Sequence, residues 1–420
     1  MIEVARKTKE RAMLIALDTK EFSKEIIEEH IDELEELADT AGAETIFKVI
    51  QSKRGIDPAY YIGKGKAEEL AQLVELNEIN LVIFDDDLTP VQVRNLEKMF
   101  NRKVLDRSGL ILDIFASRAK TKEAKTQVEL AQLQYMLPRL TRAWTHLSKQ
   151  YGGIGTKGPG ETQIETDRRL IRTRISLLKD KLEKIEAHRQ TQSSGRKNFV
   201  KIAIAGYTNA GKSTLFNLLT RANVFAEDKL FATLDSTTRS IELDDTQKLL
   251  ISDTVGFIRK LPTHLVASFK STLNEVRDAD IILHVIDISH PYFEDHIKVV
   301  DETLKEFGSE KKKIIKVFNK VDLITDKALI EFIKNSYKDS VLISASRGIN
   351  ISTLKNLLKK VLEENIIEER IVLPLTATKK ASQIHNFAEV LKTDYDEEKI
   401  QIIYRTTKQN SEKIKKIISH

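Results

Sequence analysis

The chain has 420 residues, of which 41% are hydrophobic and 31% are charged, and its formal net charge is +5. These values are ordinary for a globular protein of about two to four domains, and they exclude a disordered chain. The absence of cysteine excludes disulfides, thiolate zinc sites and cysteine nucleophiles, and the nine histidines are scattered without a metal-ligand spacing.

The N-terminus is too charged for a signal peptide, and no apolar run along the chain is long enough to span a membrane. We therefore expect a cytoplasmic protein, with only a peripheral association with membranes left open. Residues 1–115 alternate strand and helix patterns and predict a small α/β domain. The expected strands are residues 13–17, 44–51, 81–84 and 103–105, and the expected helices are residues 20–40, residues 66–77 and a helix after Pro90.

Two features of this first domain suggest a second nucleotide site. A glycine turn at Gly63 and Gly65 precedes a helix, and three acids, residues 85–87, follow a predicted strand. Together they could cradle a nucleotide and its metal. We favour the simpler interpretation, in which the glycines form a helix-leading turn and the acids form a solvated strand end.

Residues 116–190 predict a long antiparallel helical hairpin. Apolar residues recur in alternating three- and four-residue steps over residues 127–147 and again over residues 164–185, and Pro138 should kink the first helix. A glycine-rich tip, residues 152–161, lies between the helices. The segment from Phe115 to Gln192 holds 16 Lys/Arg against 8 Asp/Glu. Such charge suits a polyanion such as folded RNA, although charge alone slightly favours a solvated helix surface.

A polar linker, residues 191–196, precedes a strand pattern, a glycine loop and a helix pattern. In this Walker A arrangement, backbone N–H groups and the helix N-terminus surround phosphate oxygens. Lys212 reaches the β- and γ-phosphates, and Ser213 offers a hydroxyl to Mg²⁺, the only metal that we expect. The loop consists of Gly206, Tyr207, Thr208, Asn209, Ala210, Gly211, Lys212 and Ser213.

Three later segments follow predicted strands and complete a guanine nucleotide site. In the first, Asp253 can hold the metal through water, and the N–H of Gly256 can sense a γ-phosphate. In the second, the carboxylate of Asp322 can accept two hydrogen bonds from the guanine edge, for which adenine has no matching donors. The third offers backbone amides to guanine O6. The segments are Asp253, Thr254, Val255 and Gly256; Asn319, Lys320, Val321 and Asp322; and Ser344, Ala345 and Ser346.

These patterns predict an α/β fold. A P-loop GTPase domain with a mostly parallel sheet, residues 199–366, follows the N-terminal α/β domain and its hairpin. A strand pattern at residues 400–404 between helical patterns predicts a small α/β C-terminal domain, residues 371–420.

The chain resembles the HflX family of ribosome-associated GTPases over nearly its full length. The likeness rests on residues 106–119 and 127–140 before the tip, on residues 152–155 and 158–169 at and after it, and on residues 207–210, 231–235 and 253–257 in the GTPase domain. It implies a GTPase that binds the large ribosomal subunit and its RNA and helps to split or rescue stalled ribosomes, or acts in ribosome biogenesis or stress.

The resemblance also assigns residues between the nucleotide loop and Asp253. It implies that Thr233 is the switch threonine that ligates Mg²⁺ and contributes to catalysis with Lys212 and Gly256, a choice that the residues alone leave open against Thr237 and Thr238. The nucleotide contacts implied in this segment are Phe231, Ala232, Thr233, Leu234 and Asp235. Family members have also been credited with ATP binding by the N-terminal region.

Phe257 occupies the position where many small GTPases carry a glutamine that orients water. An apolar ring cannot do this by hydrogen bonding, so we expect slow intrinsic hydrolysis. Two alternatives to a ribosome-driven GTPase therefore stay open: an assembly or stress adaptor with negligible turnover, and ATP-dependent RNA remodelling by the N-terminal domain. We expect a monomer.

Overall fold

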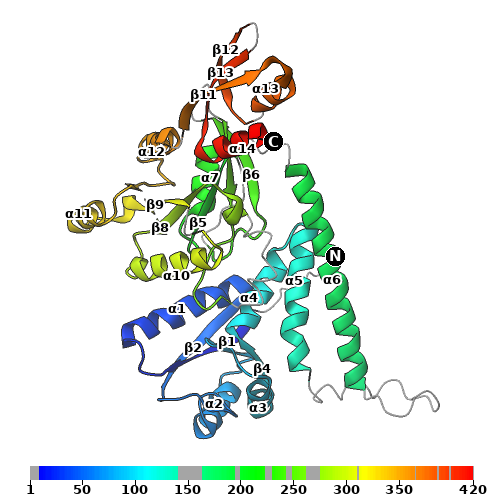
Figure 1. The fold of residues 1–420 in the computed structure, drawn as a ribbon. Coiled ribbons are helices and arrows are strands. Elements are labelled where there is room, and N and C mark those ends of the chain that lie inside the picture. Colours follow the sequence, from blue (N-terminus) through cyan, green and yellow to red (C-terminus); the bar gives the residue numbers. More distant parts are fainter. Residues whose placement is uncertain are drawn as a thin grey trace, which may run out of the picture.

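The computed structural model describes residues 9–140, 163–193, 199–222, 229–242, 248–261, 275–309, 312–364, 366–385, 387–396 and 399–419 (Figure 1). They form three sheets and a helical pair beside them. None of the described helices is both long and apolar enough to cross a membrane. The glycine-rich tip, residues 152–161, lies outside the described residues.

The N-terminal domain is built on a four-stranded parallel sheet in the order β2-β1-β3-β4. Every strand and helix expected between residues 13 and 105 is present, within a few residues of its expected bounds. The elements are β1 (Glu10–Asp18), α1 (Lys24–Ala41), β2 (Ala43–Ser52), α2 (Lys64–Leu76), β3 (Leu81–Phe84), α3 (Pro90–Phe100), β4 (Lys103–Asp106) and α4 (Arg107–Arg118).

Local sequence explains where these helices begin and end. Ser23 caps α1 by accepting a hydrogen bond from its first turn, and Gly42 adopts the left-handed conformation that ends it. Thr89 and Gln92 form a reciprocal capping box at α3, and Pro90 occupies its first turn, where no N–H partner is lost.

The helical pair differs from the expected hairpin at its first helix. Helix α5 (Lys122–Met136) ends before Pro138, which lies in a 3₁₀ turn, Leu137–Arg139. The expected kink at Pro138 is wrong, because Pro138 terminates the α-helix instead of bending it. The remainder of the expected first helix, residues 141–147, lies outside the described residues. Helix α6 (Gln163–Ser193) extends into the stretch expected to be a linker.

The two helices are antiparallel, as expected. Arg168 on α6 donates to the carbonyl of Leu140, and Arg174, further along α6, pairs with Glu129, which lies earlier in the chain. On α6, Leu178 is buried, and Ile171, Ile175, Leu182 and Ile185 of the same stripe are partly buried. The apolar stripe read from the sequence therefore forms the contact between the helices.

The central domain, residues 199–364, contains a six-stranded sheet in the order β10-β9-β8-β5-β7-β6. All pairs are parallel except β6 with β7, and β6 was not expected from the sequence. This is the P-loop GTPase fold that was predicted. Its main elements are β5 (Val200–Gly206), α7 (Lys212–Thr220), β6 (Thr237–Glu242), β7 (Lys248–Asp253), β8 (Ile281–Asp287), α10 (Phe293–Glu306), β9 (Lys313–Asn319), α11 (Lys327–Ser336), β10 (Ser340–Leu342) and α12 (Ile351–Glu364).

The C-terminal domain is a three-stranded antiparallel sheet in the order β11-β13-β12 with two helices. Its first strand begins at residue 366, ahead of the expected boundary at 371, so the sheet follows α12 directly. The elements are β11 (Ile366–Pro374), α13 (Thr378–Ile384), β12 (Glu389–Tyr395), β13 (Lys399–Thr407) and α14 (Lys408–Ser419).

The N-terminal and central domains share one apolar core. Buried side chains of β1, α1 and α4 pack continuously with Phe231 and Phe257 of the central domain. The rings of Phe115, on α4, and Phe231 meet edge to face, with their centroids 4.7 Å apart. Because these contacts are apolar and interlocked, movement of the segment around Phe231 disturbs the N-terminal domain directly.

Candidate functional site: a nucleotide pocket joined to the N-terminal domain

A pocket opens beside the nucleotide loop of the central domain. It lies where β5 ends and α7 begins, at the carboxyl end of the parallel strands, which is the usual ligand position in such sheets. The lining residues include ten that were expected to bind nucleotide, together with Thr214 and Lys229. The expected ones are Thr208, Asn209, Gly211, Lys212, Ser213, Phe231, Ala232, Thr233, Thr254 and Gly256.

Lys212 is buried in this pocket and points back onto its own loop. Its Nζ donates to the backbone carbonyl of Tyr207 at 2.6 Å. Burial lowers the pKa of Lys212 to about 8, against an attraction to Asp253 that works in the opposite direction. A bound phosphate would place negative charge beside the ammonium of Lys212 and stabilise its charged form, so the side chain is suited to an anionic ligand.

Ser213, Thr233 and Asp253 converge at one end of the pocket. The hydroxyl of Ser213 lies 2.7 Å from Thr233 Oγ1 and donates to Asp253 Oδ2, also at 2.7 Å. The other carboxylate oxygen of Asp253 is buried without a hydrogen-bond partner among the described residues. Burial raises the pKa of Asp253. Two hydroxyls and an under-satisfied carboxylate form an oxygen donor set of the kind that Mg²⁺ prefers.

The alternatives to Thr233 lie elsewhere. Thr238 Oγ1 pairs with Ser252 Oγ at 2.8 Å on β6 and β7, and Thr237 is the first residue of β6. The structure thus brings Thr233 to Ser213 and leaves Thr238 in the sheet.

Two glycines permit the close approach of backbone segments around the pocket. A Cβ at Gly256 would lie 2.9 Å from Lys212 Nζ and 2.8 Å from Thr208 Cγ2, so any side chain there would displace the lysine. Gly211 has φ +89°, and a Cβ there would collide with the amide of Asn319. The nucleotide loop is also bonded to the segment after Asp253, because Thr208 N–H donates to Phe257 O at 2.7 Å.

The residues expected to bind guanine lie on loops that are locked to the nucleotide loop. Asn319 donates to Ala210 O and accepts from the Ala345 N–H, both at 2.9 Å. Asn319 therefore holds the loop that contains Ala345 and its own loop against the nucleotide loop. Asp322 is partly exposed, and its nearest cation is the Arg347 guanidinium at 3.9 Å, which leaves its carboxylate accessible. Lys320 pairs with Asp287 at 2.6 Å.

Asp235, which was expected to contact nucleotide, is placed outside the pocket lining. Its carboxylate accepts hydrogen bonds from the backbone N–H of Lys120, at 3.1 Å, and from the hydroxyl of Thr121, at 2.5 Å. Thr121 is the N-cap of α5. The segment that carries Thr233 is thus attached to the start of the helical pair.

A buried ion cluster, which we call the domain cluster, joins the N-terminal and central domains. Glu33 on α1 pairs with Arg107, and Arg259 lies 3.2 Å from the same carboxylate. Tyr207 of the nucleotide loop donates its hydroxyl to the other oxygen of Glu33. Burial opposes ionisation of Glu33, but the two guanidiniums outweigh it and hold the pKa below its ordinary value.

Asp85 completes the domain cluster and corrects its interpretation as a solvated strand end. It is buried, and its oxygens lie 2.8 Å from Arg107, 3.3 Å from Arg259 and 2.8 Å from Lys260. Burial alone would raise the pKa of Asp85, yet these cations lower it to about 2. A carboxylate already engaged by three cations is a poor metal ligand, so it does not support an N-terminal nucleotide site.

The sequence offered one signal for this cluster. Two basic residues, Arg259 and Lys260, come three and four positions after Gly256, and Asp85 stands at the end of a buried strand. Their partnership could not be inferred, because residues more than 170 positions apart meet only once the two domains are packed.

Comparisons with known proteins agree with this architecture. Residues 28–116 match a family model described as "GTP-binding GTPase N-terminal", residues 118–196 match "GTP-binding GTPase Middle Region", and residues 201–320 match "50S ribosome-binding GTPase".

Individual relatives match from about three quarters of the chain to its full length. The protein named GTPase HflX of Caldanaerobacter subterraneus subsp. tengcongensis is 45% identical over 100% of this chain and 96% of its own length. That of Flavobacterium psychrophilum is 52% identical over 74% of this chain and 76% of its own length. A solved GTP-binding protein from Sulfolobus solfataricus in complex with GDP is 26% identical, with a TM-score of 0.44, and covers 84% of this chain and 99% of that one. The chain is a GTP hydrolase and belongs to the HflX family of ribosome-associated GTPases.

Proposed function

We propose that this GTPase binds the large ribosomal subunit and its RNA through the helical pair and the N-terminal domain, and uses GTP hydrolysis to split or rescue stalled ribosomes in the cytoplasm. The observation that carries the proposal is the attachment of both nucleotide-sensing segments to the preceding domains. Asp235 bonds the start of α5, and Arg259 enters the domain cluster on α1. Loss of a γ-phosphate can therefore alter the surfaces that would face a ribosome.

Mg²⁺ fits this proposal. Ser213 and Thr233 would hold the ion, with Asp253 acting through water, because their oxygens already converge and one oxygen of Asp253 lacks a partner. When bound, the ion neutralises charge on the β- and γ-phosphates. Lys212 binds the same phosphates, and the N–H of Gly256 reports whether the γ-phosphate is present.

The N-terminal domain is the weaker candidate for nucleotide chemistry. Asp85, the residue best placed to hold a metal there, is engaged by Arg107, Arg259 and Lys260. ATP-dependent remodelling therefore gains no support from the contacts of this domain.

Sedimentation of ribosomes tests the proposal. Intact ribosomes are mixed with the purified chain and GTP, a non-hydrolysable analogue or GDP, and separated on a density gradient. In the presence of the non-hydrolysable analogue, we expect the chain to sediment with large subunits. In the presence of GTP, we expect free ribosomal subunits to accumulate. Unchanged ribosomes and an unbound chain with every nucleotide would contradict both binding and splitting. Binding without dissociation of the ribosome would favour the alternative of an assembly or stress adaptor with negligible turnover.

A further inference from the structure

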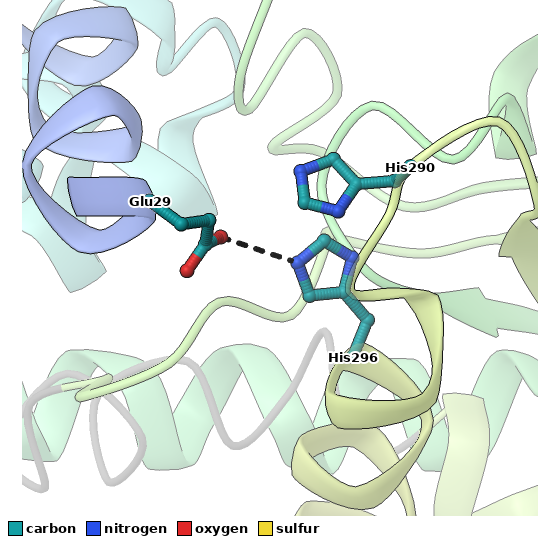
Figure 2. Close-up of side chains that lie close together, drawn as sticks. All are labelled: Glu29, His290 and His296. Atoms are coloured by element: carbon teal, nitrogen blue, oxygen red, sulfur yellow. Dashed lines mark ion pairs between the residues drawn. The ribbon is translucent and has the colours of Figure 1, made fainter. Parts of the chain in front are cut away.

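Two histidines and a glutamate meet where α1 of the N-terminal domain faces α10 of the central domain. Glu29 projects from α1, His290 precedes α10, and His296 lies near its start (Figure 2). One ligand atom from each residue lies within 4.8 Å of the others. We propose that this trio, the seam site, binds a divalent transition-metal ion of the zinc class and thereby joins the two domains.

The polar groups of the seam site are poorly satisfied by the protein itself. The Glu29 side chain is only 15% exposed, yet it makes no hydrogen bond within the part of the chain that the structure describes. Its oxygens lie 3.7 Å from His296 Nε2 and 3.9 Å from His30 Nε2, too far for hydrogen bonds. His296 Nε2 is itself buried without a hydrogen-bond partner there. A cation between Glu29 and His296 would satisfy both groups.

The donor set selects the class of ion. Two imidazole nitrogens and one carboxylate oxygen are the ligands of zinc-like ions, whereas Mg²⁺ and Ca²⁺ prefer oxygen alone. Three protein ligands leave a fourth position for water.

The three residues of the seam site differ in how readily they could bind the ion. A tetrahedral ion with bonds of about 2.0–2.1 Å holds its ligand atoms roughly 3.3–3.5 Å apart. Glu29 and His296, whose atoms are 3.7 Å apart, nearly meet this spacing, whereas the full trio, within 4.8 Å, must contract by up to about 1.4 Å. His290 Nδ1 accepts a hydrogen bond from the Tyr292 N–H at 3.2 Å. Coordination through either ring nitrogen breaks that bond, because Nδ1 must then bind the metal or carry the proton. Glu29 and His296 are therefore the anchors, and His290 is the weaker ligand.

The seam site contacts the nucleotide loop through the side chain of His296. The His296 ring stacks on the ring of Tyr207, with centroids 3.8 Å apart and planes inclined by 4°. Tyr207 in turn bonds Glu33 on α1. An ion that fixes His296 against Glu29 would thus hold α1, α10 and the nucleotide loop in one arrangement.

Metal titration of the full chain tests the site. Untagged, nucleotide-free protein is stripped with a chelator, and Zn²⁺ binding is followed by calorimetry and Co²⁺ binding by visible absorption. We expect one ion per chain, a Co²⁺ spectrum typical of four-coordination, and no competition from excess Mg²⁺. Glu29→Gln and His296→Gln should each weaken Zn²⁺ binding by about 100-fold, and His290→Gln by less. His188→Gln, a change at an exposed histidine on α6, is the matched control and should bind like the parent.

Thermal melting without metal shows whether each variant is folded. Zn²⁺ should raise the melting temperature of the parent and of His188→Gln, but not that of His296→Gln. Glu29→Asp, which withdraws the carboxylate by one methylene, keeps the test valid if Glu29→Gln does not fold, and should lose affinity likewise. Stripped parent that binds no Zn²⁺, seam variants that bind it as the parent does, or equal competition by Mg²⁺ would each overturn the proposal.

Discussion

The hydroxyl of Tyr207 donates a hydrogen bond to Glu33 and so ties the nucleotide loop to helix α1 of the N-terminal domain. The same oxygen accepts the backbone N–H of Arg259 at 3.1 Å. Arg259 follows the segment that carries Asp253 and Gly256. One phenolic oxygen therefore joins the phosphate-binding loop, the segment that responds to the γ-phosphate, and a separate domain.

Tyr207→Phe removes this oxygen while keeping the ring that stacks on His296. Because Glu33 is a buried carboxylate that loses a hydrogen bond, we expect the free energy of unfolding to fall by about 1.5–3 kcal/mol. Chemical denaturation of the nucleotide-free chain measures the change. Tyr395→Phe, at a residue 71% exposed, is the control and should change little. Equal denaturation midpoints for parent and Tyr207→Phe would show that the bond contributes nothing to stability.

Asp322→Asn tests base recognition. The change turns a double acceptor into a group with its own donors, which suits the xanthine edge better than guanine. We expect preference to shift from GTP toward xanthosine triphosphate, measured by competition for binding. Unaltered GTP affinity and selectivity would remove Asp322 from the site.

Much of the fold and of the nucleotide loop could be predicted because both depend on local sequence. Apolar periodicity gave the strands of the N-terminal sheet, and the loop from Gly206 to Ser213 has its chemistry in consecutive residues. The end of α5 at Pro138 was misjudged because a proline can kink or terminate a helix, and the outcome depends on packing.

What could not be predicted depends on contacts between distant segments. Asp235 was expected at the nucleotide, but it lies against Thr121, a contact made only when the central domain packs beside α5. The seam site has the same origin, since Glu29 lies more than 250 positions before His290 and His296 in the chain. Histidines without a metal-ligand spacing in sequence can still converge in the fold.

GTP affinity should depend on pH through Lys212, whose pKa burial lowers to about 8. Phosphate binding requires the charged ammonium, so below pH 8 the affinity is nearly constant, and above it binding must take up a proton. We expect affinity to be about threefold weaker at pH 8.5 than at pH 7.5. Calorimetry in two buffers of different ionisation enthalpy measures the uptake. If GTP binding at pH 8.5 released protons, or neither released nor took them up, Lys212 would not be the group that titrates with a pKa of about 8.

Lys212→Ala and Ser213→Ala should each reduce GTP turnover by at least about 100-fold, because they remove phosphate neutralisation and a metal ligand. Steady-state phosphate release measures the loss, and circular dichroism verifies the fold. Lys334→Ala, at an exposed lysine on α11, is the matched control and should retain turnover. Lys212→Ala protein that hydrolyses GTP at the parental rate would refute the role of the lysine.

The position of Phe257 predicts the intrinsic rate of GTP hydrolysis. It is buried in the core shared by the two domains, with 1% of its surface exposed, so it neither reaches the pocket nor orients water. Intrinsic hydrolysis should be slow, and a bound subunit should accelerate it by ordering the segment around Thr233. Because the helical pair is basic, this stimulation should weaken as salt rises.

Variants of the helical pair separate docking from chemistry. Replacing residues 152–161 by a short linker, or changing Arg169 and Arg172 to Gln, should abolish stimulation and spare the basal rate. Arg168 and Arg174 are left in place, because changing them would break the bonds to Leu140 O and Glu129 that join the two helices. Lys181→Gln with Lys184→Gln, on the same helix, is the matched control of equal charge change.

GTP turnover with and without large ribosomal subunits is the most direct test of a ribosome-activated GTPase. We predict a low basal rate that rises at least about tenfold with large subunits, does not rise in the tip-replaced or Arg169/Arg172 variants, and rises normally in the Lys181/Lys184 control. A rate that large subunits leave unchanged in the parent chain would contradict the account.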